Sequence, residues 1–362
     1  MFIIPFSSLT TNELFSLAKE KLNSDIVDWE RDIWQFIFDW IDPSVDSIKV
    51  STSGSTGLPK QIEHCKGAVL NSARLTCEAL HLKSNCTALL CLPANKISGM
   101  MMLVRSIWNK MDLYCVRPSS NPLLEITDKE IFDFSAFTPM QLYGIDADRK
   151  KMKKVERINQ IIIGGEEIPE SLLASLRIMK STAYATFGMT ETISHIALRK
   201  LNGKLISDSF TTLPGISIST DDRKCLVVEA PELGVHQLIT NDVIQLTSST
   251  QFEWLGRKDN IINSGGVKIF PEKIEDQLKN LIGLPFFITG VDNARTGQEV
   301  AIAIEKKSFT LKEAYEMKQK FEKLGKLCTP KSILVISKFL RTENGKIKRA
   351  ESLQQLLMTV VV

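Results

Sequence analysis

The sequence of 362 residues contains little histidine and no cysteine pair with metal-binding or redox spacing. There are four histidines and seven cysteines, and no Cys-x-x-Cys motif occurs. These counts exclude a zinc site of the usual kind. An odd number of scattered cysteines also disfavours the disulfide framework of small secreted proteins. We therefore expect reduced thiols and a cytoplasmic protein.

The sequence also has no strong excess of either charge and no long apolar run. Lysine and arginine number 45 against 42 aspartates and glutamates, for a formal net charge of +3, so nucleic acid is not an expected partner. The densest basic stretch, residues 149–154, is interpreted as a solvated connector. No apolar stretch approaches the roughly 20 residues of a membrane-spanning helix, and the first residues lack the basic start of a signal peptide. We expect neither a membrane span nor a leader.

What the sequence does contain is an alternation of strand-like and helix-like segments. Apolar residues recur with helical spacing between the strand-like runs, as over Lys66–Leu80, and Pro169 suits the start of another helix. Alternation of this kind predicts an α/β fold with a mostly parallel sheet. The predicted buried strands are residues 87–93, 112–118, 133–139, 158–165 and 182–188.

The second half of the sequence is richer in β-strand patterns, which are interrupted by a segment rich in Gly, Asn and charge at residues 256–266. We predict a large N-terminal α/β domain with a parallel-rich sheet and a β-rich subdomain, residues 1–257, and a small mobile α+β C-terminal domain, residues 258–362. The strands predicted here are 225–230, 236–240, 243–248, 251–256, 285–291, 299–305 and 332–337, with helices at 271–281 and 311–324.

Residues 49–60, which read KVSTSGSTGLPK, combine hydroxyls, glycines and a lysine after a strand-like run. The segment is not a Walker A loop, because Gly54 and Gly57 are too close and two residues separate Gly57 from Lys60. Hydroxyl donors, inward-turned backbone N–H groups and a point charge nevertheless suit an oxyanion. A phosphate-binding loop is favoured over a plain flexible turn.

Four segments, in order, resemble the motifs of the adenylate-forming superfamily, which comprises acyl-CoA synthetases, adenylation domains and luciferases. The resemblance extends from about residue 47 to the end of the chain. It implies an enzyme that joins a carboxylate to AMP with release of pyrophosphate and then transfers the acyl group to the thiol of coenzyme A, with ATP and Mg²⁺ required. The four segments are the loop at 52–60, FGMTE at 187–191, GRKDNIINSGGVKIFPEKIE at 256–275 and RTENGKIKRAE at 341–351.

The resemblance assigns the phosphate and metal contacts. Thr190 is implied to contact the α-phosphate, and Glu191 is implied to coordinate Mg²⁺, a hard ion that favours carboxylate oxygen. The alternative for Glu191 is an ordinary acidic residue at a helix start. The residues implied to hold the β- and γ-phosphates are Thr52, Ser53, Gly54, Ser55, Thr56, Gly57 and Lys60.

The resemblance also assigns the adenosine contacts. The adenine-side loop has a plain strand-to-helix turn as its alternative, and the ribose-binding aspartate has a turn aspartate as its alternative. Asn241 stands where glycine is usual before that aspartate. The implied residues are Phe187 and Gly188 beside adenine, Gly164, Gly165 and Glu166 in the adenine-side loop, Asp242 on the ribose, and Arg257 on the ribose or phosphate.

Three features imply a moving C-terminal domain. Lys346 is the candidate catalytic lysine, with an exposed lysine among others as its alternative, and it would stabilise the charge that moves from carboxylate to α-phosphate. Asp259 is the implied hinge residue. After the domain turns, Ser264, Gly265 and Gly266 are implied to face the tunnel for coenzyme A.

The acyl pocket is implied to be edged by polar groups and cations, which suits a dicarboxylate better than a fatty chain. For Arg105 a helix-surface cation is the alternative, and for His195 a packing histidine is the alternative. The short length and the segments around these residues resemble bacterial o-succinylbenzoate–CoA ligases of menaquinone synthesis. The candidate acyl-site residues are Lys96, Ser98, Gly99, Arg105 and His195.

Other functions stay open at this point: another acyl- or aryl-CoA synthetase, a stand-alone adenylation enzyme that loads a carrier protein, and a non-catalytic nucleotide-binding protein. The expected partners are a small carboxylic acid, ATP and coenzyme A, and a homodimer is one of the oligomeric states left open. Fewer residues precede the phosphate loop than in typical members. We therefore expect an N-terminal region that is truncated to helices at about 11–40.

Overall fold

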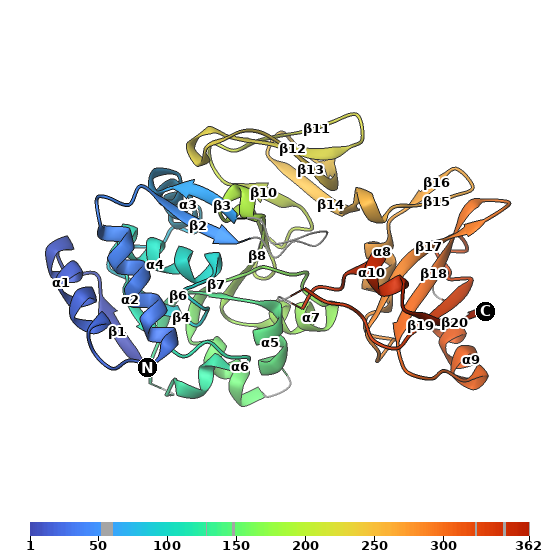
Figure 1. Ribbon diagram of the computed structural model, residues 1–362, viewed down its shortest axis with the longest axis horizontal. Helices are drawn as coiled ribbons and strands as arrows, with labels where there is room; N and C mark the ends of the chain where they lie inside the picture. Colours follow the sequence, from blue (N-terminus) through green and yellow to red (C-terminus); the bar gives the residue numbers. More distant parts are fainter. Residues whose placement is uncertain (52–60, 128, 147–148, 323, 343–344, 362) are drawn as a thin grey trace.

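The computed structural model describes residues 1–51, 61–127, 129–146, 149–322, 324–342 and 345–361. In these residues one large sheet is built from the segment up to Arg257, and a smaller sheet is built from Ile262 onward. Figure 1 shows the smaller sheet, in orange and red, as a separate body at one end of the molecule. The mixed α/β architecture predicted from the alternating pattern is confirmed.

Five parallel strands form the centre of the large sheet, in the order β5-β4-β6-β7-β8. All five were predicted as buried strands, and their alternation with helices is why they pair in parallel. The carboxyl ends of parallel strands share one edge, so the segments after β6, β7 and β8 lie near one another. The strands are β4 (Thr87–Leu90), β5 (Asp112–Cys115), β6 (Phe132–Phe137), β7 (Ile158–Ile163) and β8 (Thr182–Gly188).

Helices join these strands and bury their apolar faces on the sheet. The predicted N-terminal helices are present, but residues 2–5 form an additional strand that pairs antiparallel with β5. The basic run is a helix rather than a connector, and Lys154 Nζ donates to the Leu123 carbonyl at 3.1 Å. The elements are β1 (Phe2–Pro5), α1 (Thr11–Leu22), α2 (Asp28–Ile41), α3 (Lys66–Ala79), α4 (Ile97–Asn109), η1 (Pro122–Glu125), α5 (Pro139–Asp146), α6 (Arg149–Val155) and α7 (Glu170–Ile178).

Antiparallel strands continue the large sheet in the order β9-β10-β14-β13-β12-β11. The predicted strands 236–240 and 243–248 are one strand, because β13 bulges against β12 between Ile239 and Val243 and so carries Asn241 within the strand. The elements are β9 (His195–Lys200), β10 (Phe210–Thr212), β11 (Ser217–Thr220), β12 (Cys225–Ala230), η3 (Pro231–Leu233), β13 (Val235–Leu246) and β14 (Gln251–Arg257), and a separate hairpin pairs β2 (Ser47–Ser51) with β3 (Gln61–Cys65).

The small sheet has two buried faces. Along β18, Ile302 belongs to a core that includes residues of α8 and α9, whereas Ala303 belongs to a second core that contains Leu353 of α10, as the two-residue period of a strand requires. The predicted boundary at 257/258 lies between β14 and β15. The elements are η4 (Lys258–Asn260), β15 (Ile262–Ser264), β16 (Val267–Ile269), α8 (Pro271–Leu278), β17 (Phe286–Asn293), β18 (Gly297–Glu305), α9 (Leu311–Lys320), β19 (Ser332–Ile336), α10 (Arg349–Leu353) and β20 (Leu356–Val361).

A buried amide ties α7 to the strands that lead to the site. Asn202 is 2% exposed, and its Nδ2 donates to the carbonyls of Leu176, Met179 and Ser181 at 2.9, 3.2 and 2.7 Å. Its Oδ1 accepts from Ala183 N at 3.0 Å. Both the NH₂ group and the carbonyl oxygen of this side chain therefore have partners inside the protein.

Replacing Asn202 with Ala should lower the free energy of unfolding by about 3 kcal/mol, because several buried backbone groups lose their partner. Denaturant titration followed by circular dichroism measures the change. Asn159→Ala removes an exposed amide that donates to Asp133 at 3.0 Å, and it should change stability by no more than about 0.5 kcal/mol. Equal effects of the two substitutions would contradict this account of Asn202.

Candidate active site

The predicted phosphate loop lies outside the described residues, so Thr52, Ser53, Gly54, Ser55, Thr56, Gly57 and Lys60 stay predictions. The strands on either side are described. β2 ends at Ser51 and β3 begins at Gln61, and the two pair antiparallel with Ser51 opposite Gln61.

The segment after β8 forms a tight turn that presents Thr190 and Glu191. Thr190–Thr192 is a single 3₁₀ turn (η2), in which Glu191 is exposed and Thr192 is buried. It is followed by Ile193 at φ 66° and ψ −60°, and Ser194 N donates to Thr192 O at 2.7 Å. These values describe a γ-turn of the strained, positive-φ kind. Glu191 therefore lies in a single 3₁₀ turn of fixed shape, and its role toward Mg²⁺ stays a prediction.

The aromatic residue before this turn has protein neighbours. The ring centroid of Phe187 lies 5.5 Å from that of Phe210 and 5.1 Å from that of Phe252. Phe187 is half-buried and Gly188 is exposed. The expected stacking of Phe187 on adenine stays a prediction.

The loop after β7 is shaped by close packing. A Cβ on Gly164 would stand 2.0 Å from Thr186 Oγ1, so any larger residue would displace the Thr186 hydroxyl. Partial desolvation raises the pKa of Glu166, and the charge of Lys346 opposes that rise. Lys346 of the C-terminal part therefore acts electrostatically on the loop that is predicted to border adenine.

Lys346 itself lies on a turn that faces the large sheet. Thr342 N donates to Lys346 O at 2.8 Å, and Lys346 N donates to Thr342 Oγ1 at 3.2 Å. A Cβ on Gly345 would stand 4.0 Å from Met140 Cε of α5. In Figure 1 the red segment that carries this turn runs from the small sheet toward α7. The exposed Lys346 side chain is thus held near the edge of the large sheet.

An ion pair also joins the two parts of the chain. Lys279, at the end of α8, has its Nζ 3.2 Å from Glu167 Oε1. Desolvation raises the pKa of Glu167, and the charge of Lys279 opposes the rise. Glu167 directly follows the loop that carries Gly164, Gly165 and Glu166, so this contact places Lys279 of the C-terminal part beside that loop.

The predicted ribose aspartate belongs to a strand. Asp242 lies in β13 opposite Arg257, so its interpretation as a turn aspartate is wrong. It is 8% exposed, its Oδ1 accepts from Trp254 Nε1 at 3.0 Å, and its Oδ2 lies 3.6 Å from Arg257 Nη1. The indole and the guanidinium hold the carboxylate in one orientation.

The predicted hinge residue lies beside this pair. Arg257 Nη2 is 3.4 Å from Asp259 Oδ2, and Asn241 Nδ2 donates to the same oxygen at 3.2 Å. The glycine that is usual at position 241 could not make this hydrogen bond, so Asn241 adds a contact to Asp259. Asp242, Arg257 and Asp259 are brought together where β14 ends.

The residues predicted to face coenzyme A form a hairpin of the small sheet. Ser264 ends β15, and Gly265 and Gly266 connect it to β16 with φ values of 56° and 80°, as a two-residue type I′ turn requires. Gly265 N donates to Thr296 O at 2.8 Å. The hairpin is well formed, and its role toward coenzyme A stays a prediction.

The predicted acyl residues divide into an exposed group and a buried group. Lys96 precedes α4 and is exposed, as is Ser98. A Cβ on Gly99 would stand 2.2 Å from Pro93 O, so this glycine is needed for packing. Arg105 is 2% exposed and His195 is 5% exposed, so the interpretation of Arg105 as a surface cation is wrong.

Arg105 begins a directed chain of hydrogen bonds. Its Nη2 donates to Ser194 Oγ at 2.9 Å, and Ser194 Oγ lies 3.4 Å from His195 Nδ1. Thr76 Oγ1 lies 3.2 Å from His195 Nε2 and donates its own proton to Ser72 O at 3.0 Å. Since the Thr76 proton is used, Nε2–H is the donor to Thr76, and Nδ1 is left to accept from Ser194.

Burial sets the charges in this chain. It lowers the pKa of Arg105 to about 10, which leaves the guanidinium charged at neutral pH. Burial, together with the charge of Arg105, lowers the pKa of His195 well below its ordinary value. His195 is therefore neutral, as its hydrogen bonds require.

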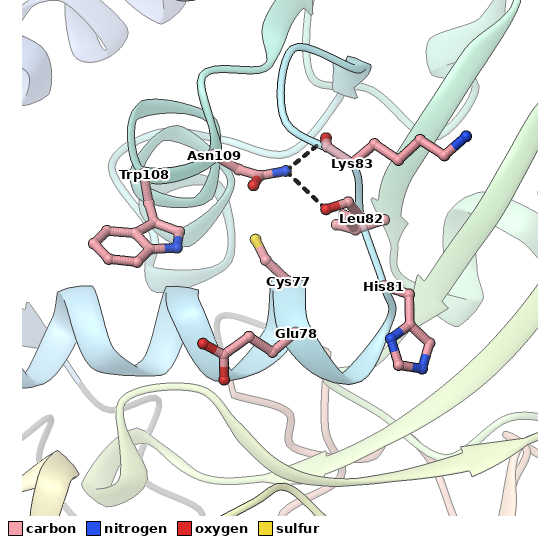
Figure 2. Close-up of a pocket in the computed structure, with 7 residues that line it drawn as sticks. All are labelled: Cys77, Glu78, His81, Leu82, Lys83, Trp108 and Asn109. Atoms are coloured by element: carbon pink, nitrogen blue, oxygen red, sulfur yellow. Dashed lines mark hydrogen bonds between the residues drawn. The ribbon is translucent and has the colours of Figure 1, made fainter.

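A surface depression lies close by but is not lined by any predicted site residue. It lies between the ends of α3 and α4, where Asn109 Nδ2 donates to Leu82 O at 3.3 Å and to Lys83 O at 2.8 Å (Figure 2). Figure 2 shows that the Trp108 ring points away from Lys83. Its lining residues are Cys77, Glu78, His81, Leu82, Lys83, Trp108 and Asn109.

Comparison with known proteins places the chain in a family. The family described as AMP-binding enzyme matches residues 50–229. An acyl-CoA synthetase (AMP-forming)/AMP-acid ligase II-like protein of Dyadobacter fermentans is 30% identical, with a TM-score of 0.65 over 98% of this chain and 99% of that chain. The chain belongs to the AMP-binding enzyme family. Within it, the chain is an AMP-forming acyl-CoA synthetase.

Two further relatives of this AMP-binding enzyme share a name. The 2-succinylbenzoate–CoA ligase of Lactococcus lactis is 26% identical over 84% of this chain and 70% of that one. The o-succinylbenzoate CoA synthetase of Bacillus subtilis, solved with its acyl-adenylate intermediate, is 21% identical with a TM-score of 0.70, over 84% of this chain and 68% of that chain. The second comparison shows a common fold.

Sequence reasoning missed the residues that support the predicted ones. Trp254, Ser194 and Thr76 bond to Asp242, Arg105 and His195, and no local pattern marked any of the three. Thr76 is 119 residues from His195, and such a contact follows only from the fold. In the described residues, none of the helices combines the length and apolar character that crossing a bilayer requires.

The lowered pKa of His195 predicts how stability depends on pH. Below the unfolded-state pKa of about 6.5, His195 takes up a proton in the unfolded protein but stays neutral in the folded protein. Lowering the pH therefore favours the unfolded state. Stability should decline by up to about 1.4 kcal/mol per pH unit below that point. His195→Gln should flatten the decline in denaturant titrations between pH 5 and 7, whereas the exposed His236→Gln should not. An unchanged slope in both variants would contradict a neutral His195.

Proposed function

We propose that this acyl-CoA synthetase converts o-succinylbenzoate to its coenzyme A thioester in menaquinone synthesis. In the first step a carboxylate oxygen of the acid attacks the α-phosphorus of ATP, and pyrophosphate leaves. In the second step the thiol of coenzyme A attacks the acyl carbonyl, and AMP leaves. The names of the Lactococcus lactis and Bacillus subtilis relatives support this substrate.

The observation that carries the proposal is the buried charge of Arg105. Among the described residues, no carboxylate forms an ion pair with Arg105, and its Nε has no hydrogen-bond partner. A buried cation without an anion is costly, so such a group is a candidate to bind one. A substrate with a second carboxylate, retained while the first is activated, would supply that anion. Benzoate or a fatty acid would leave Arg105 without one.

The nucleotide and metal roles belong to the same proposal. A structure of the Bacillus subtilis enzyme contains ATP and a magnesium ion. Thr190 and the exposed Glu191 offer the hard oxygen donors that Mg²⁺ takes, so these residues fit the ion. When bound, Mg²⁺ would offset phosphate charge during adenylation. The loop at 52–60, Gly164–Glu166, Phe187, Asp242 and Arg257 would hold the rest of the nucleotide.

The two-part organisation fits a reaction in two steps. We assign adenylation to residues 1–257 and a mobile lid to residues 258–362. Lys346 already lies near the edge of the large sheet and would stabilise the charge that develops on the α-phosphate. Rotation at Asp259 would then withdraw Lys346 and bring Ser264, Gly265 and Gly266 toward coenzyme A. The Lys279–Glu167 ion pair would have to break in that rotation.

Pyrophosphate release with a panel of acids tests the function. With o-succinylbenzoate, kcat/KM should exceed that with benzoylpropionate, benzoate or hexanoate by about 100-fold or more, because only the first offers both carboxylates in one molecule. Lys346→Ala serves as the control for release by a contaminating enzyme. Activity with benzoate but none with o-succinylbenzoate would favour another aryl-CoA synthetase.

A further inference from the structure

His64 links the hairpin that precedes α3 to the turn that carries Thr190 and Glu191. It lies in β3, is 8% exposed, and its Nε2 is 2.8 Å from Thr190 O, a residue 126 positions away. A carbonyl oxygen only accepts, so His64 Nε2 carries a proton and donates it. β3 belongs to the two-stranded sheet and Thr190 follows the large sheet, so this hydrogen bond joins two separate elements.

The turn that receives this bond needs external support. Ile193 is β-branched and has φ 66°, a conformation that persists only where surrounding contacts enforce it. Ile193 itself is fully buried, and Thr192 Oγ1 accepts from Met189 N at 3.1 Å. Thr190 O accepts from Ile193 N at 3.0 Å in addition to His64. The His64 bond thus holds the start of the turn from outside its own segment.

The contact uses the imidazole through one atom. His64 Nε2 donates to the carbonyl of Thr190, and the Glu191 side chain is exposed. The bond therefore fixes the backbone of the turn and leaves the Glu191 carboxylate accessible to a cation.

We propose that His64 is a positioning residue that holds the Thr190–Glu191 turn in the orientation in which it receives the α-phosphate and Mg²⁺ of ATP. The inference rests on the proposed function, which assigns Mg²⁺ and the α-phosphate of ATP to this turn. His64 acts only through the backbone of Thr190. Its replacement should therefore slow adenylation and leave the attack by coenzyme A unchanged.

The test compares His64→Gln, whose amide can still donate at similar reach, with His64→Leu, which is similar in size and cannot donate. His64→Leu should weaken Mg·ATP binding in calorimetry by about tenfold and lower kcat/KM for pyrophosphate release by about 10- to 100-fold, since small misplacements cost this much. His64→Gln should stay within about threefold of wild type. In ligand-free protein, amide exchange at residues 190–194 should rise in His64→Leu and not in His64→Gln.

Matched controls separate this inference from the proposed function. Thioester formation from supplied acyl-adenylate should change by less than about threefold in His64→Leu, and exposed His236→Leu should change neither step. Equal loss in both steps, or no difference between the Gln and Leu variants in exchange and binding, overturns the inference. If wild type binds no Mg·ATP, the proposed function fails, and the exchange measurement still decides whether His64 holds the turn. Should His64→Leu not fold, His64→Asn, with its shorter reach, replaces it and must differ from His64→Gln in the same way.

Discussion

In the proposed function, the acyl side of the site depends on one buried guanidinium. Arg105 lies on α4, where the four residues before it are buried methionines and aliphatic residues. Its guanidinium donates to Ser194 on the turn after β8. Its charge helps to keep His195 neutral, and neutral His195 is what allows the hydrogen bonds to run in one direction from Arg105 to Thr76 and Ser72. Among the described residues, no carboxylate pairs with Arg105. We propose that the substrate is chosen because it supplies this carboxylate.

In the proposed function, the same turn contributes to both the nucleotide side and the acyl side of the site. Thr190 and Glu191 begin it and are assigned to the nucleotide. Ser194 ends it, accepts from Arg105 and lies 3.4 Å from His195 Nδ1 at the start of β9. The strained γ-turn at Ile193 fixes the distance between these two pairs, and His64 and Thr192 hold the turn in place. The activated carboxylate and the α-phosphate must meet within bonding distance, so a rigid connection between their binding groups is an advantage.

The sequence predicted the architecture well because alternation and periodicity are local signals. The five parallel strands, the helix over 66–79 and the βα pattern of the C-terminal part all follow from the spacing of apolar residues. Prediction was wrong at residues 236–248, which form one strand because β13 bulges against β12 between Ile239 and Val243. For Arg105 only the alternative of a surface cation was wrong, because the side chain is buried in the core. The motif residues were recognisable from their residue types. His64 and Ser194 act across 126 and 89 positions, and Trp254 bonds to Asp242 on the neighbouring strand, and no local pattern marks any of the three.

The most direct test of the central claim is a chemical double-mutant cycle at Arg105. Adenylation kinetics would be measured for wild type and Arg105→Gln with o-succinylbenzoate and with benzoylpropionate, which lacks the ring carboxylate. We predict that wild type prefers the dicarboxylate by about 100-fold or more and that the substitution removes most of this preference by slowing only the dicarboxylate. An undiminished preference in Arg105→Gln, or equal loss with both acids, would contradict the claim that the buried cation selects the substrate.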